Sequence, residues 1–131
     1  MHYSTRISGI LAAALLVSAM PQASAHHSAA PFDMTKKVTV TGTVEKWMFS
    51  NPHSWLYVSV KKTGGTKQIW GFEAGSAGML ARHGWNSRDM KAGDIVTVTA
   101  SPARGGKPVG LIRSIKLSNG KTLSDGAPVP N

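Results

Sequence analysis

Two histidines directly follow a signal-type cleavage motif near the start of the chain. The triplet Ala-Ser-Ala at 23–25 is the small-residue pattern after which signal peptidases cut, and His26 and His27 come next. Cleavage after Ala25 would make His26 the new N-terminus. A terminal histidine presents an α-amine and an imidazole together, and nitrogen ligands favour copper over hard cations. The junction therefore predicts export and indicates a copper chelate at His26.

A terminal chelate of this kind needs a second imidazole from elsewhere in the chain. His27, His53 and His83 are the candidates, and His53 lies in an Asn-Pro-His-Ser turn close to Met48. Imidazole and thioether together form a Cu(I) ligand set, whereas the absence of cysteine and of zinc-type spacing disfavours a closed zinc site. The candidate metal residues are therefore His26, His27, His53 and Met48. The simpler alternatives are a solvated terminus, locally bonded histidines, and a methionine that fills a gap in the core.

Aromatic and basic residues form a second candidate site. Trp55 and Tyr57 alternate with apolar residues that should face a core, so both rings are expected on the outer face of a strand. Aromatic rings there could stack on bases or sugars, with Lys61, Lys62 and Lys67 nearby for anions. This pattern predicts a module that binds a polyanion or a glycan. The alternative is that the N-terminal arm or a loop covers the rings as a satellite core.

Catalytic signatures are missing from the sequence. There is no Ser-His-acid pattern, no Gly-x-Ser-x-Gly, no Walker loop and no dinucleotide fingerprint, and the six acidic residues are scattered singly. We therefore expect a non-enzymatic binding domain, with copper as its first candidate ligand and a polyanion or glycan as the alternative. A copper oxygenase built on His26 is a third hypothesis, which needs a second placed histidine and a substrate surface.

The first 25 residues have the three parts of a secretory signal. Arg6 gives the positive start, residues 7–17 are apolar, and Pro21 precedes the cleavage motif. The apolar run is too short to span a bilayer, and no later segment is long and apolar enough. The sequence thus predicts a periplasmic or secreted protein. Loss of Arg6 lowers the formal net charge from +9 to +8, which favours contact with anionic surfaces or simply aids solubility.

Alternating apolar and polar residues predict a mainly β domain. One short helix is expected at 76–83, and strands are expected at 37–46, 54–61, 67–74, 95–100 and 111–117. A helix between the third and fourth of five strands is the order of the OB-fold, so we predict a small five-stranded antiparallel barrel. Gly42 suggests a bend or bulge at a barrel corner. Another small open barrel, or a sheet with one packed helix, is the alternative.

The expected organisation has four parts. A cleavable signal covers 1–25 and an extended arm covers 26–36, with Phe32 as its anchor on the domain. The barrel follows at 37–123, and the Pro- and Gly-containing end at 124–131 is expected to be disordered.

Several short motifs together resemble a family of small exported bacterial proteins labelled only as a domain of unknown function. The motifs are His26-His27-Ser28, Phe32-Asp33, Gly42-Thr43-Val44, Asn51-Pro52-His53-Ser54, Trp70, Gly84-Trp85 and Gly93-Asp94. The resemblance covers nearly all of the expected mature chain, and Ala92 departs from it where a proline is usual. It implies export and a small β domain, and it implies no established activity.

Overall fold

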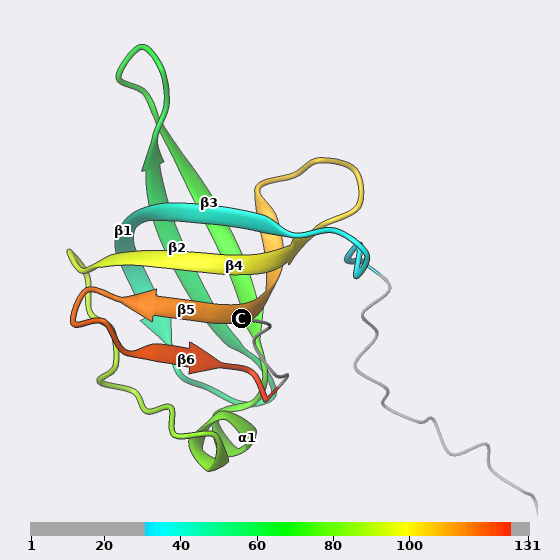
Figure 1. Cartoon of the computed structure of the whole chain (residues 1–131), viewed down its shortest axis with the longest axis vertical. Coiled ribbons are helices and arrows are strands. Elements are labelled where there is room, and N and C mark those ends of the chain that lie inside the picture. The colour runs from blue at the N-terminus through cyan, green and yellow to red at the C-terminus, as the bar shows by residue number, and fades with distance from the viewer. Residues whose placement is uncertain (1–30, 127–131) are drawn as a thin grey trace, which may run out of the picture.

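Six strands and one short helix make up residues 31–126, the part of the chain that the computed structural model describes (Figure 1). The elements are β1 Val38–Met48, β2 Ser54–Lys61, β3 Lys67–Ala74, α1 Ala77–Arg82, β4 Ile95–Pro102, β5 Val109–Leu117 and β6 Thr122–Ser124.

The strands form one sheet that closes on itself. Their order is β3-β2-β1-β4-β5-β6, and a further pairing between β3 and β5 closes a five-stranded barrel. The closing pair is parallel, with Gly71 opposite Val109 and Glu73 opposite Leu111, whereas the other pairs are antiparallel. The predicted OB-like barrel with a helix between its third and fourth strands is confirmed. The parallel closure makes it a mixed barrel, and β6 adds a short strand beside β5.

Strand β1 curves so that it can pair with two partners. Its first half, up to Thr43, pairs with β4, and its second half pairs with β2. Gly42 lies at the change of partner, where a Cβ would stand 2.4 Å from the carbonyl oxygen of Ser59. Only glycine permits this close approach of two backbones. The register shift follows a few residues later, between Val44 and Lys46.

The barrel interior is filled by alternate residues of every long strand. Leu56 and Val58 of β2 are fully buried, as their phase in the sequence predicts, and Phe72, Val98 and Ile115 join them from the neighbouring strands. Burying a side chain of this size stabilises the fold by about 1.5–3 kcal/mol. One contiguous core therefore holds together all the elements that carry candidate site residues.

Helix α1 closes one end of the barrel (Figure 1). Its N-cap is Ser76, whose hydroxyl accepts a hydrogen bond from the amide of Met79 at 3.2 Å. Gly84 follows its end at φ +84°, the left-handed position that favours glycine. Leu80 points inward and is fully buried, and Trp85 folds back and is 2 % exposed. The helix that the sequence predicts at 76–83 is thus found.

The described part of the N-terminal arm is fastened to the barrel. Phe32 is buried and pairs with Ala103, just beyond β4. The guanidinium of Arg113 donates hydrogen bonds to the Ser101 hydroxyl at 2.8 Å and to the Met34 carbonyl at 2.6 Å. The first described residues of the arm therefore lie beside β4 and β5. His26, His27 and the predicted signal lie outside the described residues.

The C-terminal end of the described chain lies against the barrel rather than beyond it. Ser124, where the disordered tail was predicted to start, belongs to β6, and the Asp125 amide donates to the Arg113 carbonyl at 3.2 Å. The tryptophan ring of Trp85 holds the same segment, because its Nε1 donates to the Ser124 carbonyl at 2.9 Å.

No helix among residues 31–126 is long and apolar enough to cross a membrane.

Candidate functional site

The turn between β1 and β2 holds His53 in a fixed position. The Asn51–Pro52 peptide bond in this turn is cis. The Ser50 hydroxyl donates to the His53 carbonyl at 2.7 Å, and the Ser50 amide donates to the Ser54 hydroxyl at 3.2 Å. The Ser54 amide in turn donates to the Gly75 carbonyl at 3.0 Å. These bonds tie the turn to the end of β3, so the imidazole is carried by a rigid part of the barrel.

Glu73 orients the imidazole of His53. The ring nitrogen Nδ1 contacts the Glu73 carboxylate, and the two side chains are 30 % and 20 % exposed. A carboxylate on one ring nitrogen fixes the tautomer and the direction of the ring, as it does for histidines that bind metals through the other nitrogen. The pair thus combines limited solvent contact with a set orientation, which suits a ligand-binding histidine.

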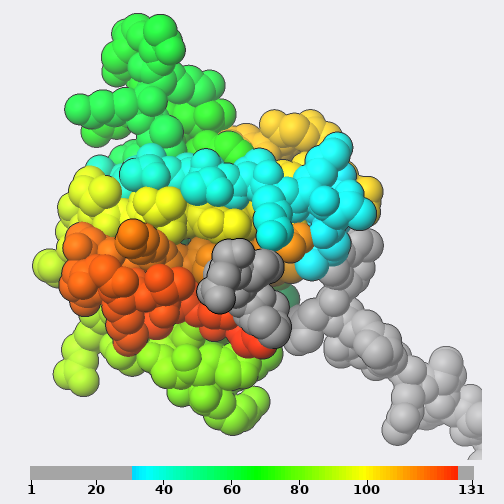
Figure 2. All heavy atoms as spheres, viewed as in Figure 1, coloured from blue at the N-terminus to red at the C-terminus, as the bar shows by residue number. Residues whose placement is uncertain are grey.

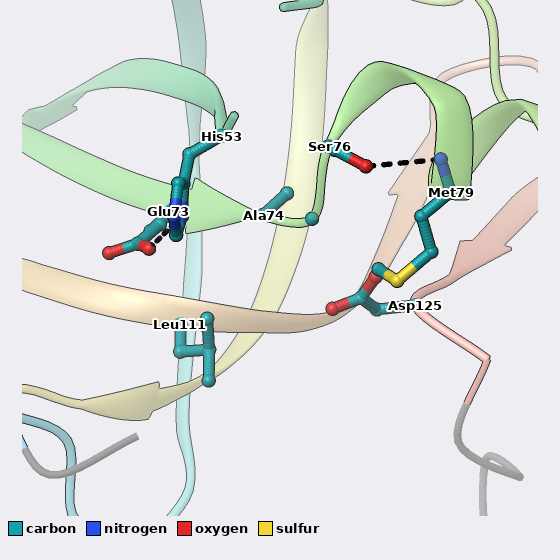
Figure 3. Close-up of a pocket in the computed structure, with 8 residues that line it drawn as sticks. His53, Glu73, Ala74, Ser76, Met79, Leu111 and Asp125 are labelled. Carbon is teal, nitrogen blue, oxygen red and sulfur yellow. Dashed lines mark hydrogen bonds and ion pairs between the residues drawn. The ribbon is translucent and has the colours of Figure 1, made fainter. Parts of the chain in front are cut away.

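A pocket of about 210 Å³ opens beside this pair. Figure 3 shows His53 and Glu73 on one side of the pocket, with Leu111 below them, and Met79 and Asp125 on the other side. Its apolar lining comes from Ala74, Met79 and Leu111. The pocket therefore offers an imidazole, two carboxylates and a thioether around an apolar surface.

Asp125 is the least satisfied polar residue of the pocket. Its Oδ1 atom is buried, and among residues 31–126 it is the only buried side-chain nitrogen or oxygen that has no hydrogen-bond partner. Burial raises the pKa of this carboxyl, and the nearby His83 acts in the opposite direction. A buried acceptor without a donor costs free energy, which a cation or a hydrogen-bond donor in the pocket would recover.

Replacing Asp125 by asparagine is expected to stabilise the fold at neutral pH. Because its pKa is raised on folding, Asp125 opposes folding at pH 7, and this cost fades as the pH falls toward the unfolded value near 3.8. The side chain is half-exposed, so we expect a gain of less than about 1 kcal/mol in unfolding free energy at pH 7. Urea unfolding at pH 7 and pH 4.5 should show a gain that is smaller at the lower pH.

Asp94→Asn is the matched control with the opposite sign. Hydrogen bonds from the Lys91 amide and ammonium lower the pKa of Asp94, so its ionised form favours folding. This contribution is present above the unfolded pKa and is lost as the pH falls through the folded one. Asp94→Asn should therefore destabilise at pH 7. A loss of stability at pH 7 with Asp125→Asn as well would contradict the burial argument for Asp125.

The aromatic candidates lie on the outer face of β2. The rings of Trp55 and Tyr57 stack with centroids 6.3 Å apart and an interplanar angle of 16°, and both are half-buried. They extend over Gly71 of β3, where an added Cβ would stand 3.6 Å from the Tyr57 ring. Glycine thus leaves the two rings room to lie flat against the sheet. The stacked pair also adjoins the His53–Glu73 pair, because Trp55 stands opposite Glu73 in the register.

The lysine candidates gather at the other end of the same two strands. Lys61 and Lys67 face each other across the β2–β3 pair, and Lys62 follows in the hairpin, which projects from the barrel (Figure 2). All three are exposed. Lys61 comes four residues after Tyr57, or about 13 Å along the strand. The aromatic pair and the lysines therefore share a face without forming one compact site.

Within residues 31–126, no three His, Cys, Asp or Glu side chains come together in a group that could hold a metal ion. Of the candidate metal residues that the sequence predicts, His53 and Met48 lie within this part of the chain.

The family comparison agrees with the resemblance in the sequence motifs. Residues 13–113, well over half of the chain, match the model of a family described as "Family of unknown function (DUF6152)". The chain belongs to this family. No curated protein and no solved structure matches it. For this DUF6152 chain, the side chains themselves are therefore the basis for any functional argument.

The structure separates some of the predicted site residues of this DUF6152 chain. Met48 is 36 % exposed and stands opposite Trp55, so it lies on the outer face, while Met79 lines the pocket beside His53. Trp47 turns the other way and packs against Trp85, with ring centroids 6.0 Å apart. Met48 and His53, which the sequence analysis placed together as copper ligands, therefore do not share the pocket.

Two residues of the pocket carried no functional signal in the sequence. Glu73 was one of six scattered acidic residues, and Asp125 was placed in the disordered tail. Both reach the pocket through pairing between distant segments, since Glu73 stands opposite Leu111 and Asp125 is bonded to Arg113. Because these pairings join segments far apart in the sequence, the sequence alone did not predict that Glu73 and Asp125 lie at one pocket. His83, a candidate imidazole, lies at the C-cap of α1, where Gly126 passes against its ring.

Proposed function

We propose that this protein is an exported, non-enzymatic binding domain that holds copper through its mature N-terminus. In this proposal the amine and imidazole of His26 are two ligands, and the imidazole of His53 is the third. The observation that carries the proposal is the contact between Glu73 and Nδ1 of His53 at the rim of a pocket. This is the outer-shell arrangement that orients metal-binding histidines.

The donors around His53 support copper over harder cations. A site with three nitrogen ligands binds Cu(II) more tightly than the other divalent first-row metals. The Met79 thioether in the same pocket adds a soft donor for Cu(I). Calcium and magnesium sites need several oxygen ligands, and the pocket offers only two carboxylates, of which Glu73 is engaged with His53. The donor chemistry therefore fits copper best.

Export is the premise of this proposal, and it has its own test. Cleavage after Ala25 is needed to free the amine of His26, so intact-mass measurement of protein purified from the periplasm should give a chain that begins at His26. A protein that retains Met1 would contradict both the proposed export and the proposed chelate at His26.

The copper proposal predicts that affinity depends on a free terminal amine and on His53. Calorimetry with Cu(II) should give the tightest binding for the mature protein. One extra residue before His26 should weaken binding by more than about ten-fold, because the amine becomes part of a peptide bond. His53→Ala should weaken it by about ten-fold or more through the loss of a ligand.

His83→Ala is the matched control for His53→Ala. His83 is a histidine of the same barrel end, and it lies at the helix end outside the set of residues that lines the pocket. Its replacement should leave Cu(II) affinity unchanged. Equal affinities for the mature, extended and His53→Ala forms would remove the copper proposal.

A second candidate function is the binding of a polyanion or a glycan on the outer face of β2 and β3. The observation that favours it is the stacked, half-exposed pair of Trp55 and Tyr57, since flat aromatic surfaces bind bases and sugar rings by stacking. Lys61, Lys62 and Lys67 would add attraction for anions further along the same strands.

This second function predicts two separable effects on binding to heparin or single-stranded nucleic acid. Trp55→Ala should weaken binding by about 1–3 kcal/mol for each lost stacking contact, with little change in salt dependence. Lys61→Gln should lower the slope of log K against log salt by about 1. Affinity that responds neither to salt nor to Trp55→Ala would exclude this function.

A further inference from the structure

The pocket beside His53 combines an apolar lining with a carboxylate on its far side. Ala74, Met79 and Leu111 supply the apolar surface, and Asp125 lies on the side away from His53 (Figure 3). A second hollow of about 270 Å³ shares Leu111 and Asp125 with this pocket. Each of the two cavities is below the size at which sites for drug-sized molecules begin, about 300 Å³. The space therefore suits a small organic molecule.

Asp125 is held in place but lacks a hydrogen-bond donor. Its backbone amide donates to the Arg113 carbonyl at 3.2 Å, which fixes the residue beside β5. Its buried Oδ1 has no partner among residues 31–126. This oxygen lies close to Gly75 and Met79, because a Cβ added at Gly75 would stand 3.4 Å from Oδ1 and would also meet the end of Met79. A thioether and a residue without a side chain supply no charge to balance the carboxylate.

We propose that this pocket binds a small organic ammonium ion that carries a short apolar chain. Its N–H groups bond to the carboxylate of Asp125, and its chain lies against Leu111 and Met79. This inference goes beyond the proposed copper function, because its anchor is Asp125 and no metal takes part.

The charges of the pocket favour a cation over other small molecules. Both acidic residues of the lining, Glu73 and Asp125, would repel an anion. A neutral apolar molecule would leave the Oδ1 of Asp125 without a donor, which costs free energy. An ammonium group supplies charge-assisted hydrogen bonds, which are about twice as strong as those between neutral groups.

The apolar lining distinguishes an organic ammonium ion from a bare metal ion. Alkyl groups gain free energy from burial against Ala74, Met79 and Leu111, whereas a metal ion gains nothing from these walls. The part of the chain from 31 to 126 also has no group of three His, Cys, Asp or Glu side chains that could hold a metal ion. The lining and the carboxylate together therefore fit an amphiphilic cation.

The test is a titration of the purified protein with n-butylammonium chloride, followed by nuclear magnetic resonance in a metal-free buffer that contains a chelator. We expect saturable shifts of the backbone amides of Gly75 and Leu111. Affinity should rise about four-fold for each methylene from methylammonium to n-butylammonium, because each added group is buried. Tetramethylammonium and 1-butanol have as many heavy atoms as n-butylammonium, but the first lacks N–H groups and the second lacks charge. Both should bind at least about ten-fold more weakly.

The variant Asp125→Asn should weaken the binding of n-butylammonium by about ten-fold or more. Loss of the fold would not explain this result, since the same variant is expected to be at least as stable as the unmodified protein at neutral pH. Asp94→Asn is the matched control, because it also removes one negative charge and lies outside the pocket lining. Its affinity for n-butylammonium should be unchanged.

Three results would overturn this inference. They are equal affinities for n-butylammonium and 1-butanol, an affinity that does not depend on chain length, and an affinity that Asp125→Asn leaves unchanged. If circular dichroism shows that Asp125→Asn disturbs the fold, the comparison of the four ligands with the unmodified protein still decides.

Failure of this inference and failure of the copper function are distinguishable. Binding of n-butylammonium that depends on Asp125, together with copper affinity that is indifferent to His53, means that the ammonium site stands and the copper function falls. Copper affinity that depends on His53, without saturable binding of n-butylammonium, means the reverse.

Discussion

The variant Val58→Asp is expected to leave the protein unfolded at neutral pH. Val58 is fully buried in β2, where it stands opposite Val44 of β1 and Trp70 of β3. A carboxylate at this position would be surrounded by apolar side chains and would have no partner to offset its desolvation. The cost of several kcal/mol is comparable to the whole stability of a small domain, which is about 5–15 kcal/mol.

Far-UV circular dichroism and tryptophan fluorescence should show the loss of the fold in Val58→Asp. Ile69→Asp is the matched control, because Ile69 is 48 % exposed on the adjacent strand and the new carboxylate would remain in water. Ile69→Asp should keep the native spectrum and a cooperative urea transition. A folded Val58→Asp protein would mean that the inward face of β2 is wrongly assigned.

The elements of the fold were predictable because their signals are local. The period-2 pattern of β2 and β3 predicts 54–61 and 67–74, and these are the bounds that the structure shows. Ser76 and Gly84 mark the two ends of the helix through capping and left-handed geometry, which depend only on neighbouring residues. Where a short stretch of chain determines the structure, the sequence is sufficient to predict it.

The closure of the barrel was harder to predict from the sequence, because it depends on pairing between strands that are far apart in the chain. The parallel pair between β3 and β5 joins Gly71 to Val109, and no residue pattern distinguishes it from an antiparallel neighbour. Strand β6 spans only Thr122–Ser124, which is too short for a periodic signal. These pairings nevertheless create the pocket, since they bring Leu111 to Glu73 and place Asp125 at its side.

The residues of the candidate site also differ in how well the sequence predicted them. His53 was predicted because an Asn-Pro-His-Ser turn is a local motif, and the structure places it at the pocket. Met48 was proposed as its thioether partner from closeness in sequence, but the register shift after Val44 sends Met48 to the outer face. The thioether at the pocket belongs to Met79, which α1 delivers from across the barrel end. Sequence distance alone is therefore a poor guide to which side chains share a pocket.

Glu73→Gln is expected to lower the affinity for Cu(II) by about 10–100-fold, the usual effect of removing an outer-shell partner of a metal-bound histidine. The Glu73 carboxylate contacts Nδ1 of His53, so it can fix the tautomer and the direction of the ring. A glutamine keeps the shape of the side chain, but it removes the negative charge. Calorimetry on the mature protein at neutral pH measures the effect, and circular dichroism checks that the barrel is intact.

Glu45→Gln is the matched control, because Glu45 is the other glutamate of the chain and lies exposed on β1. Both variants remove one negative charge, so a general electrostatic effect on a cation would appear equally in the two. A loss confined to Glu73→Gln, and absent when His53 is already alanine, shows that the carboxylate acts through the imidazole. Equal affinities for Glu73→Gln, Glu45→Gln and the unmodified protein would contradict the proposal that Glu73 orients a metal-binding His53.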